Sequence, residues 1–154
     1  MGEFLASNFQ AFVHRGNAKF FRENTIEAFQ SAKEIGFNYL ETDLRITKDD
    51  KIITFHDPSL LRTSGHNIQL IDMNYKDLNR LSFFQPGHTP TFNELLEEFP
   101  TNFFNIDLTS LPFFFCKRST TIQSFIESIY FCSSFSRFVT SKRKLILAEY
   151  SLAS

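Results

Sequence analysis

The sequence contains no tryptophan, only two cysteines, and five each of glycine and proline among its 154 residues. Cys116 and Cys132 form no close-spaced metal motif and no disulfide framework, so two free thiols and a cytoplasmic location are expected. No apolar run approaches the roughly 20 residues that cross a bilayer. The first residues also lack the basic start and long apolar run of a secretory signal. These absences disfavour secreted and membrane-spanning classes of protein.

Neither positive nor negative charge is in excess. The chain has 16 Lys and Arg against 17 Asp and Glu, a formal net charge of −1. This balance excludes a strongly basic face for nucleic acid and a polybasic membrane anchor. The length suits one globular domain, and the abundant residue is phenylalanine, with 21 copies.

The first recognisable unit is a strand followed by a helix. Residues 11–13 are apolar and lead directly into residues 14–16, His-Arg-Gly, a pattern typical of a short buried strand with a polar end. Asn24 is expected to cap a helix whose apolar residues recur at helical spacing over 28–35, and Gly36 ends it. This order predicts an α/β fold.

The next segment combines a strand with two acidic residues. In residues 38–46, Glu41 and Asp43 alternate with apolar positions, so both carboxylates lie on one face of the strand. Only about five residues separate it from the extended segment 52–55, too few for a parallel crossover. An antiparallel hairpin is therefore predicted, and it brings His56 back beside the two carboxylates.

The middle of the chain is predicted to contain loops and two helices. Residues 57–71 are expected to form a loop, and residues 75–81 a short helix. Residues 90–94 have the pattern of a capping box and predict a second helix. Residues 103–108 then indicate a buried strand that carries a lone carboxylate, Asp107.

Beyond Thr109 the strand–helix pattern is lost. Residues 122–129 contain apolar residues at helical spacing, and residues 142–144 form a basic run expected in a solvated tail. The predicted organisation is an N-terminal part of a domain, 1–109, and an unassigned Phe- and Ser-rich tail, 110–154, which is expected to be either native or the product of a shifted reading frame.

Six polar side chains lie near the predicted strand ends: His14, Arg15, Glu41, Asp43, His56 and Asp107. The carboxyl ends of strands meet at one edge of a barrel or an open α/β sheet. Carboxylates suit a hard divalent cation, histidines can act as acid and base, and a guanidinium group suits a phosphate oxygen. The combination indicates phosphoryl chemistry, although each residue taken singly is more often an ordinary loop or exposed-strand residue.

At these positions the chain resembles the glycerophosphodiester phosphodiesterases. The matching motifs are HRG at 14–16, ENT at 23–25, ETD at 41–43, TKD at 47–49, HD at 56–57 and RT at 62–63. The stretch 90–100 resembles the helix that precedes the family's next metal-binding strand. The resemblance covers residues 11–108.

The resemblance implies a (β/α)₈ barrel of the phosphodiesterase and phospholipase C-like kind. It implies hydrolysis of glycerophosphodiesters, small-molecule substrates, to glycerol 3-phosphate and an alcohol. His14 and His56 correspond to the family's acid–base pair, without fixing which is the base, and Arg15 corresponds to its phosphate contact. The substrate's own glycerol hydroxyl is one candidate nucleophile.

The resemblance also implies a Mg²⁺ or Ca²⁺ site formed by Glu41, Asp43 and a later carboxylate, here Asp107. The family's late strand carries an acid, an apolar residue and a lysine, whereas this chain has Thr109 in place of the lysine. The phosphate-binding lysine is therefore missing.

A complete barrel of this kind needs about 250 residues, so the sequence predicts an incomplete barrel with impaired activity. Two alternatives stay open. One is a catalytically inactive fragment or pseudoenzyme. The other is an interaction module that self-associates through the open strand edges of a partial barrel. A related phospholipase acting on lipid head groups is mildly disfavoured by the absence of membrane and signal segments.

Overall fold

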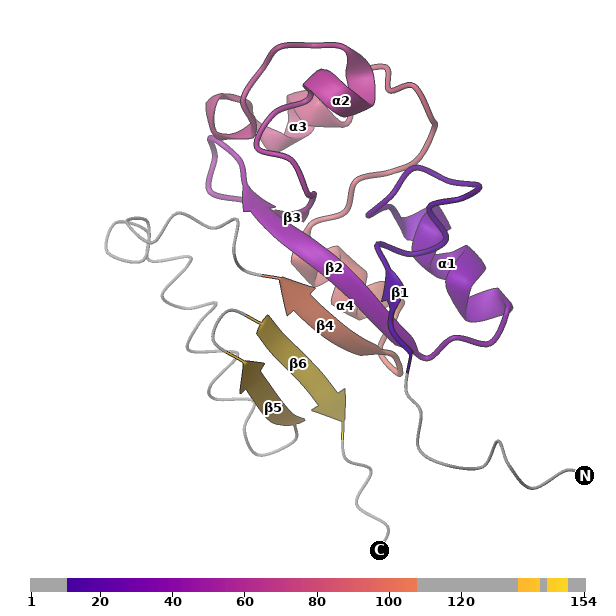
Figure 1. Cartoon of the computed structure of the whole chain (residues 1–154). Coiled ribbons are helices and arrows are strands. Elements are labelled where there is room, and N and C mark those ends of the chain that lie inside the picture. Colours follow the sequence, from indigo (N-terminus) through magenta and orange to yellow (C-terminus); the bar gives the residue numbers. More distant parts are fainter. Residues whose placement is uncertain (1–10, 108–135, 142–143, 150–154) are drawn as a thin grey trace, which may run out of the picture.

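The described part of the chain contains both strands and short helices (Figure 1). The computed structural model describes residues 11–107, 136–141 and 144–149. Its elements are β1 (Val13–His14), α1 (Ile26–Glu34), β2 (Tyr39–Ile46), β3 (Ile52–Thr54), α2 (Leu61–Ser64), the 3₁₀ helix η1 (Leu70–Asp72), α3 (Tyr75–Leu78), α4 (Phe92–Glu98), β4 (Phe103–Asp107), β5 (Ser136–Ser141) and β6 (Lys144–Glu149).

The sheet has the strand order β1-β2-β4-β6-β5, with β3 paired to β2 outside this path. β1, β2 and β4 run parallel, and β6 and β5 follow antiparallel. The carboxyl ends of the three parallel strands point the same way, toward the side where α2 and α3 lie (Figure 1). The predicted α/β fold with a parallel sheet is confirmed, and the sheet is not closed within the described residues.

The predicted hairpin is also confirmed. β2 and β3 pair antiparallel with Leu44 opposite Thr54, and the Phe55 amide donates to the carbonyl of Asp43 at 2.9 Å. In the connecting turn, the Thr47 hydroxyl donates to Asp49 Oδ1 at 2.7 Å. This hydrogen bond stabilises the turn from within, so the TKD motif has a structural role.

The helix starts follow the capping rules, with one correction. Thr25, not Asn24, is the N-cap of α1, since its hydroxyl accepts from the amide of Ala28 at 3.3 Å. The predicted capping box of α4 is present, with Thr91 and Glu94 bonding reciprocally. Gly36, with a φ of +99°, follows α1 as predicted, because glycine enters the left-handed region without a steric penalty.

α1 and α4 pack on one face of the parallel sheet. The buried cluster there consists of Phe29, Ala32, Leu40, Leu44, Ile52, Phe92, Leu95, Phe99, Phe104 and Ile106. Phe29 meets Phe99 and Phe104 edge to face, with ring centroids 6.1 and 6.0 Å apart. In β2 and β4 the even-numbered residues face this core, so the odd-numbered residues lie on the opposite face.

A second cluster lies around the elements after β3. It contains Ile53, Phe55, Leu60, Leu70 and Leu78. The prediction of a plain loop over 57–71 is wrong, because α2 and η1 form there. Leu60, just before α2, and Leu70 of η1 are buried in this cluster, and no periodic pattern in the sequence marks them.

The predicted tail includes the hairpin of β5 and β6, which no sequence pattern indicated, and Lys144 is the first residue of β6. The backbone of β6 pairs with β4. The helix proposed for 122–129 lies outside the described residues, and the boundary at 109 stays a prediction. No helix in the described part of the chain is long and apolar enough to span a membrane.

Replacement of Phe29 by alanine is expected to lower the free energy of unfolding by about 3–5 kcal/mol, because it leaves a cavity beside the Phe99 and Phe104 rings. Phe20 is the matched control: it is 68% exposed, and Phe20→Ala should change stability by less than about 0.5 kcal/mol. Urea denaturation followed by circular dichroism measures both. Equal losses for the two variants would contradict the described core.

Candidate active site

Two buried carboxylates lie on the sheet face opposite α1 and α4. Glu41 and Asp43 of β2 are 6% and 4% exposed. On the parallel neighbour β4, Asn105 is aligned with Glu41 and Asp107 with Asp43. The prediction that the two β2 carboxylates share a face is confirmed. Burial of two ionised groups requires compensating partners.

Arg15 supplies much of this compensation. Its backbone amide donates to Glu41 Oε2 at 3.1 Å, and its Nε lies 2.9 Å from Asp43 Oδ2. Arg15 has a φ of +58°, in the left-handed region. The next residue is Gly16, where a Cβ atom would lie 2.7 Å from the Ala28 carbonyl carbon. The HRG motif therefore forms a tight turn that brings a cation to the β2 carboxylates.

Asn24 is a second partner of these carboxylates. Its Nδ2 donates to Asp43 Oδ2 at 3.0 Å, and its Oδ1 accepts from the Thr42 hydroxyl at 2.9 Å. Its backbone carbonyl accepts from the Thr54 hydroxyl at 2.9 Å. Asn24 is 1% exposed and has a φ of +56°. The residue predicted to cap α1 instead holds Asp43 in place.

His56 is oriented by the adjacent carboxylate. His56 Nδ1 lies 2.7 Å from Asp57 Oδ1, and Arg62 Nε donates to Asp57 Oδ2 at 2.5 Å. Burial of Asp57 acts to raise its pKa, but the hydrogen bonds from His56 and Arg62 outweigh it and lower the pKa of this carboxyl. Asp57 therefore stays ionised at neutral pH and favours a proton on Nδ1 of His56.

Arg45 connects His56 to β2. Its Nε and Nη2 both donate to the carbonyl oxygen of His56, at 2.8 and 2.5 Å. Burial lowers the pKa of Arg45, and the carboxylates of Asp43, Asp57 and Asp107 act in the opposite direction. The hairpin thus brings the backbone of His56 to the predicted acidic strand.

His14 ends β1 beside Glu41. Its Nε2 lies 3.8 Å from Glu41 Oε2, and its side chain is 68% exposed. An exposed imidazole next to a buried carboxylate is open to a substrate and can exchange a proton with it. The predicted placement of His14 at the carboxyl end of a strand is confirmed.

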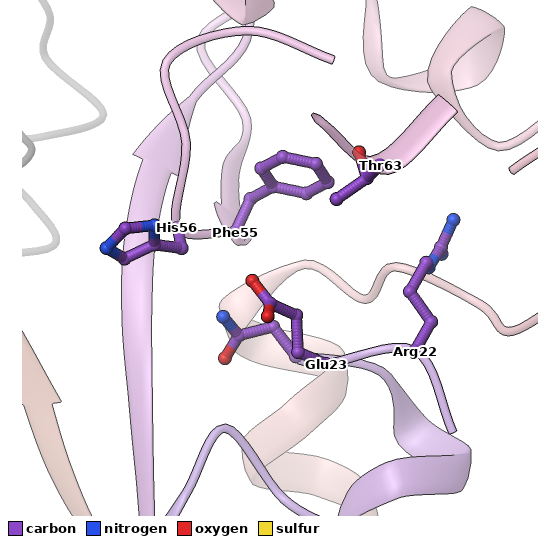
Figure 2. A pocket seen from close by; sticks show the side chains of 6 residues that line it. Arg22, Glu23, Phe55, His56 and Thr63 are labelled. Carbon is purple, nitrogen blue, oxygen red and sulfur yellow. The ribbon is translucent and has the colours of Figure 1, made fainter. Parts of the chain in front are cut away.

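A narrow pocket separates the His56 segment from the loop before α1. It is lined by Arg22, Glu23, Asn24, Phe55, His56 and Thr63. Figure 2 shows the Glu23 carboxylate directed toward the segment of Phe55 and His56. A neighbouring cavity of about 230 Å³ is lined in part by Glu23 and Arg62.

Arg22 forms the wall of this region. It is 3% exposed, lies 3.7 Å from the centre of the Phe83 ring, and donates to the Thr89 hydroxyl at 2.7 Å. Burial lowers the pKa of Arg22 to about 10, while Glu27 acts to raise it. Arg22 remains charged at neutral pH and joins the loop before α1 to residues 83–89.

The donor types on the acidic face fit a hard cation. Glu41, Asp43 and Asp107 offer carboxylate oxygens from two adjacent strands. Asn105 Oδ1, aligned with Glu41, is buried without a hydrogen-bond partner among the described residues. No three His, Cys, Asp or Glu side chains within the described ranges are grouped as a metal site. The residue types therefore suit a hard cation, whereas the placement of the described side chains does not itself form a metal site.

Four polar residues were not predicted from the sequence as part of the site: Glu23, Asn24, Asp57 and Arg62, of which Asn24 was predicted only as a helix cap. All four belong to the ENT, HD and RT motifs, so their presence was visible but their partners were not. Glu23 and Arg62 are 39 positions apart, a separation at which spacing gives no signal. Only the tertiary structure reveals that they meet.

Comparison with known proteins gives a consistent result. Residues 14–120 match the glycerophosphoryl diester phosphodiesterase family. Lysophospholipase D GDPD1 of Homo sapiens is 36% identical over 108 residues, covering 62% of this chain and 34% of that protein. The probable glycerophosphodiester phosphodiesterase 2 of Mycobacterium tuberculosis is 29% identical over 128 residues, covering 82% and 46%. The chain thus spans about a third to a half of these relatives.

Solved structures share the fold. The glycerophosphodiester phosphodiesterase of Thermotoga maritima matches with a TM-score of 0.64 and 27% identity, over 80% of this chain and 50% of that one. A phosphodiesterase of Oleispira antarctica, solved with sn-glycerol-3-phosphate as product, matches with a TM-score of 0.65 and 23% identity, over 79% and 52%. The chain therefore corresponds to about half of a phosphodiesterase barrel.

The role of Asn24 can be divided into a backbone part and a side-chain part. Asn24→Gly tolerates the positive φ but removes the bonds to Asp43 and Thr42, and we expect a loss of about 2 kcal/mol in the free energy of unfolding. Asn24→Ala adds a left-handed penalty of about 1–2 kcal/mol. Urea denaturation distinguishes the variants, and an Asn24→Gly variant as stable as the unchanged chain would exclude the bonding role.

Proposed function

The chain belongs to the glycerophosphoryl diester phosphodiesterase family, and we propose that it hydrolyses glycerophosphodiesters to glycerol 3-phosphate and an alcohol. The observation that carries the proposal is the buried pair Glu41 and Asp43 at the carboxyl end of β2, beside the exposed imidazole of His14. Acidic and basic groups at the strand ends of an α/β sheet suit chemistry on a phosphate ester.

His14 and His56 are the proposed proton carriers. One histidine takes the proton of the nucleophile, either water or the substrate's own glycerol hydroxyl, and the other gives a proton to the departing alcohol oxygen. The exposure of His14 and the carboxylate at Nδ1 of His56 support these roles. With Nδ1 held by Asp57, Nε2 of His56 is the nitrogen directed to the reaction.

Arg15 is proposed to stabilise the negative charge of the phosphate. Its guanidinium group lies at Asp43 and Glu23, at 2.9 and 3.2 Å, and its side chain is 16% exposed. These two carboxylates hold the guanidinium plane at the edge of the acidic face. A cation fixed in this way needs little rearrangement as charge develops on the phosphate.

A Mg²⁺ or Ca²⁺ ion is the proposed cofactor, with Glu41, Asp43 and Asp107 as its protein ligands. When bound, such an ion supplies positive charge to the phosphate oxygens. The shorter side chain of Asp107 extends less far than a glutamate would. Asn105, aligned with Glu41 on the same face, offers a further neutral oxygen.

A lysophospholipid is a second candidate substrate. The human relative that is 36% identical over 108 residues is a lysophospholipase D, and such an enzyme cleaves the same phosphodiester bond with an acyl chain present on the glycerol. The exposed phenylalanines Phe20 and Phe84, 68% and 72% exposed, offer apolar surface on the described part of the chain. Hydrolysis of the two substrates gives different phosphate-containing products, because only one of them carries an acyl chain on the glycerol.

The test is choline release from glycerophosphocholine and from lysophosphatidylcholine by the purified chain, with the phosphate product identified in each case. We expect metal-dependent release that stops with a chelator and returns with Mg²⁺ or Ca²⁺. His14→Gln, His56→Gln and Asp43→Asn should each lower the rate at least about 100-fold, because each removes a proton carrier or a metal ligand.

His66→Gln is the matched control, since His66 is exposed and has no place in the proposed site. It should retain the rate of the unchanged chain. Turnover that survives both the chelator and His14→Gln would disprove the proposed site. A folded chain with no turnover on either substrate would instead favour the inactive alternative.

A further inference from the structure

Arg62 of α2 lies between two carboxylates that come from different parts of the chain. Its Nε donates to Asp57 Oδ2 at 2.5 Å, just after β3. Its Nη1 donates to Glu23 Oε2 at 3.3 Å, and its Nη2 donates to the other oxygen of the same carboxylate. The hydrogen bond to Glu23 and that to Asp57 raise the pKa of Arg62. The planar guanidinium fork can serve two carboxylates at once, which a lysine ammonium cannot do with the same geometry.

Each of these two carboxylates also contacts a residue that is proposed to take part in the reaction. The other oxygen of Asp57, Oδ1, lies 2.7 Å from Nδ1 of His56. The Glu23 carboxylate accepts from Nη1 of Arg15 at 3.2 Å. Arg62 is therefore the link between the histidine side of the site and the guanidinium side.

Fold stability does not account for this arrangement. The Arg62 side chain is 52% exposed, and the carboxylates of Glu23 and Asp57 are 19% and 18% exposed. Ion pairs with an exposed partner contribute little to stability, because water competes for the charges. α2 is also a single turn of four residues, with its buried contacts made by Thr63 and Ser64 rather than by Arg62.

We propose that Arg62 is a positioning residue for the reaction at His56. By fixing the Asp57 carboxylate, it keeps the proton of neutral His56 on Nδ1 and leaves Nε2 as the proton-accepting nitrogen. This role rests on the proposed function, in which His56 transfers a proton. A carboxylate that selects the imidazole tautomer is an established way to prepare a histidine for proton transfer.

The experiment compares Arg62→Gln with the unchanged chain by ¹⁵N NMR of the histidine side chains at neutral pH. The signals of His56 are identified by their loss in His56→Gln, among the four histidines of the chain. We expect Nδ1-protonated His56 in the unchanged chain, and in Arg62→Gln a shift toward the Nε2-protonated form. The rate constant kcat should fall about 10- to 100-fold with a smaller change in KM, and Arg62→Lys should give an intermediate loss.

Arg80→Gln is the matched control, because Arg80 is a similarly exposed arginine paired with a single carboxylate, Asp77, at 3.8 Å. It should leave the His56 signals and kcat unchanged. Thermal unfolding should be nearly the same in both glutamine variants. Unchanged His56 signals in Arg62→Gln, or a kcat equal to that of Arg80→Gln, would overturn the proposal.

The NMR comparison needs no turnover. Absence of hydrolysis by the unchanged chain would therefore count against the proposed function. Unchanged tautomer signals would count against the role of Arg62, whether or not the chain is active.

Discussion

The structure depends on the burial of two carboxylates side by side on β2. Glu41 and Asp43 are almost inaccessible to water, and ionised groups in such a setting are stable only with charged or hydrogen-bonding partners. Arg15 and Asn24 supply these partners from the loop that follows β1. Both residues adopt a positive φ, a conformation that is costly outside glycine. The contacts that Arg15 and Asn24 make with the carboxylates offset this conformational cost.

The parts of the fold that were predictable are those governed by short-range rules. Alternation along β2 placed Glu41 and Asp43 on one face, and a connection too short for a crossover required the β2–β3 hairpin. The capping box of Thr91 and Glu94 gave the start of α4 because both of its bonds are local. In each case the residues that decide the structure lie within a few positions of one another.

The rest could not be predicted because distant partners decide it. Asn24 and Thr25 are both good N-cap residues, and sequence alone does not rank them. Thr25 takes the cap because Asn24 is drawn to Asp43, which is 19 positions away. The same reason explains the missed helix α2, whose N-cap residue Leu60 is buried in a cluster with Ile53, Phe55, Leu70 and Leu78. The link from Arg62 to Glu23 likewise has no local pattern.

The position of the candidate residues in the sheet explains how several of them come together in a chain that spans about half of the related structures. His14, Glu41 and Asp107 come from three neighbouring parallel strands, and register alone brings their ends together. Closure of a barrel is not needed to align adjacent strands, since each hydrogen-bonded pair fixes its own alignment. The hydrogen bond between Arg62 and Glu23 then joins α2 to the loop after β1. The relative placement of these proposed site residues is thus determined by the pairing of adjacent strands.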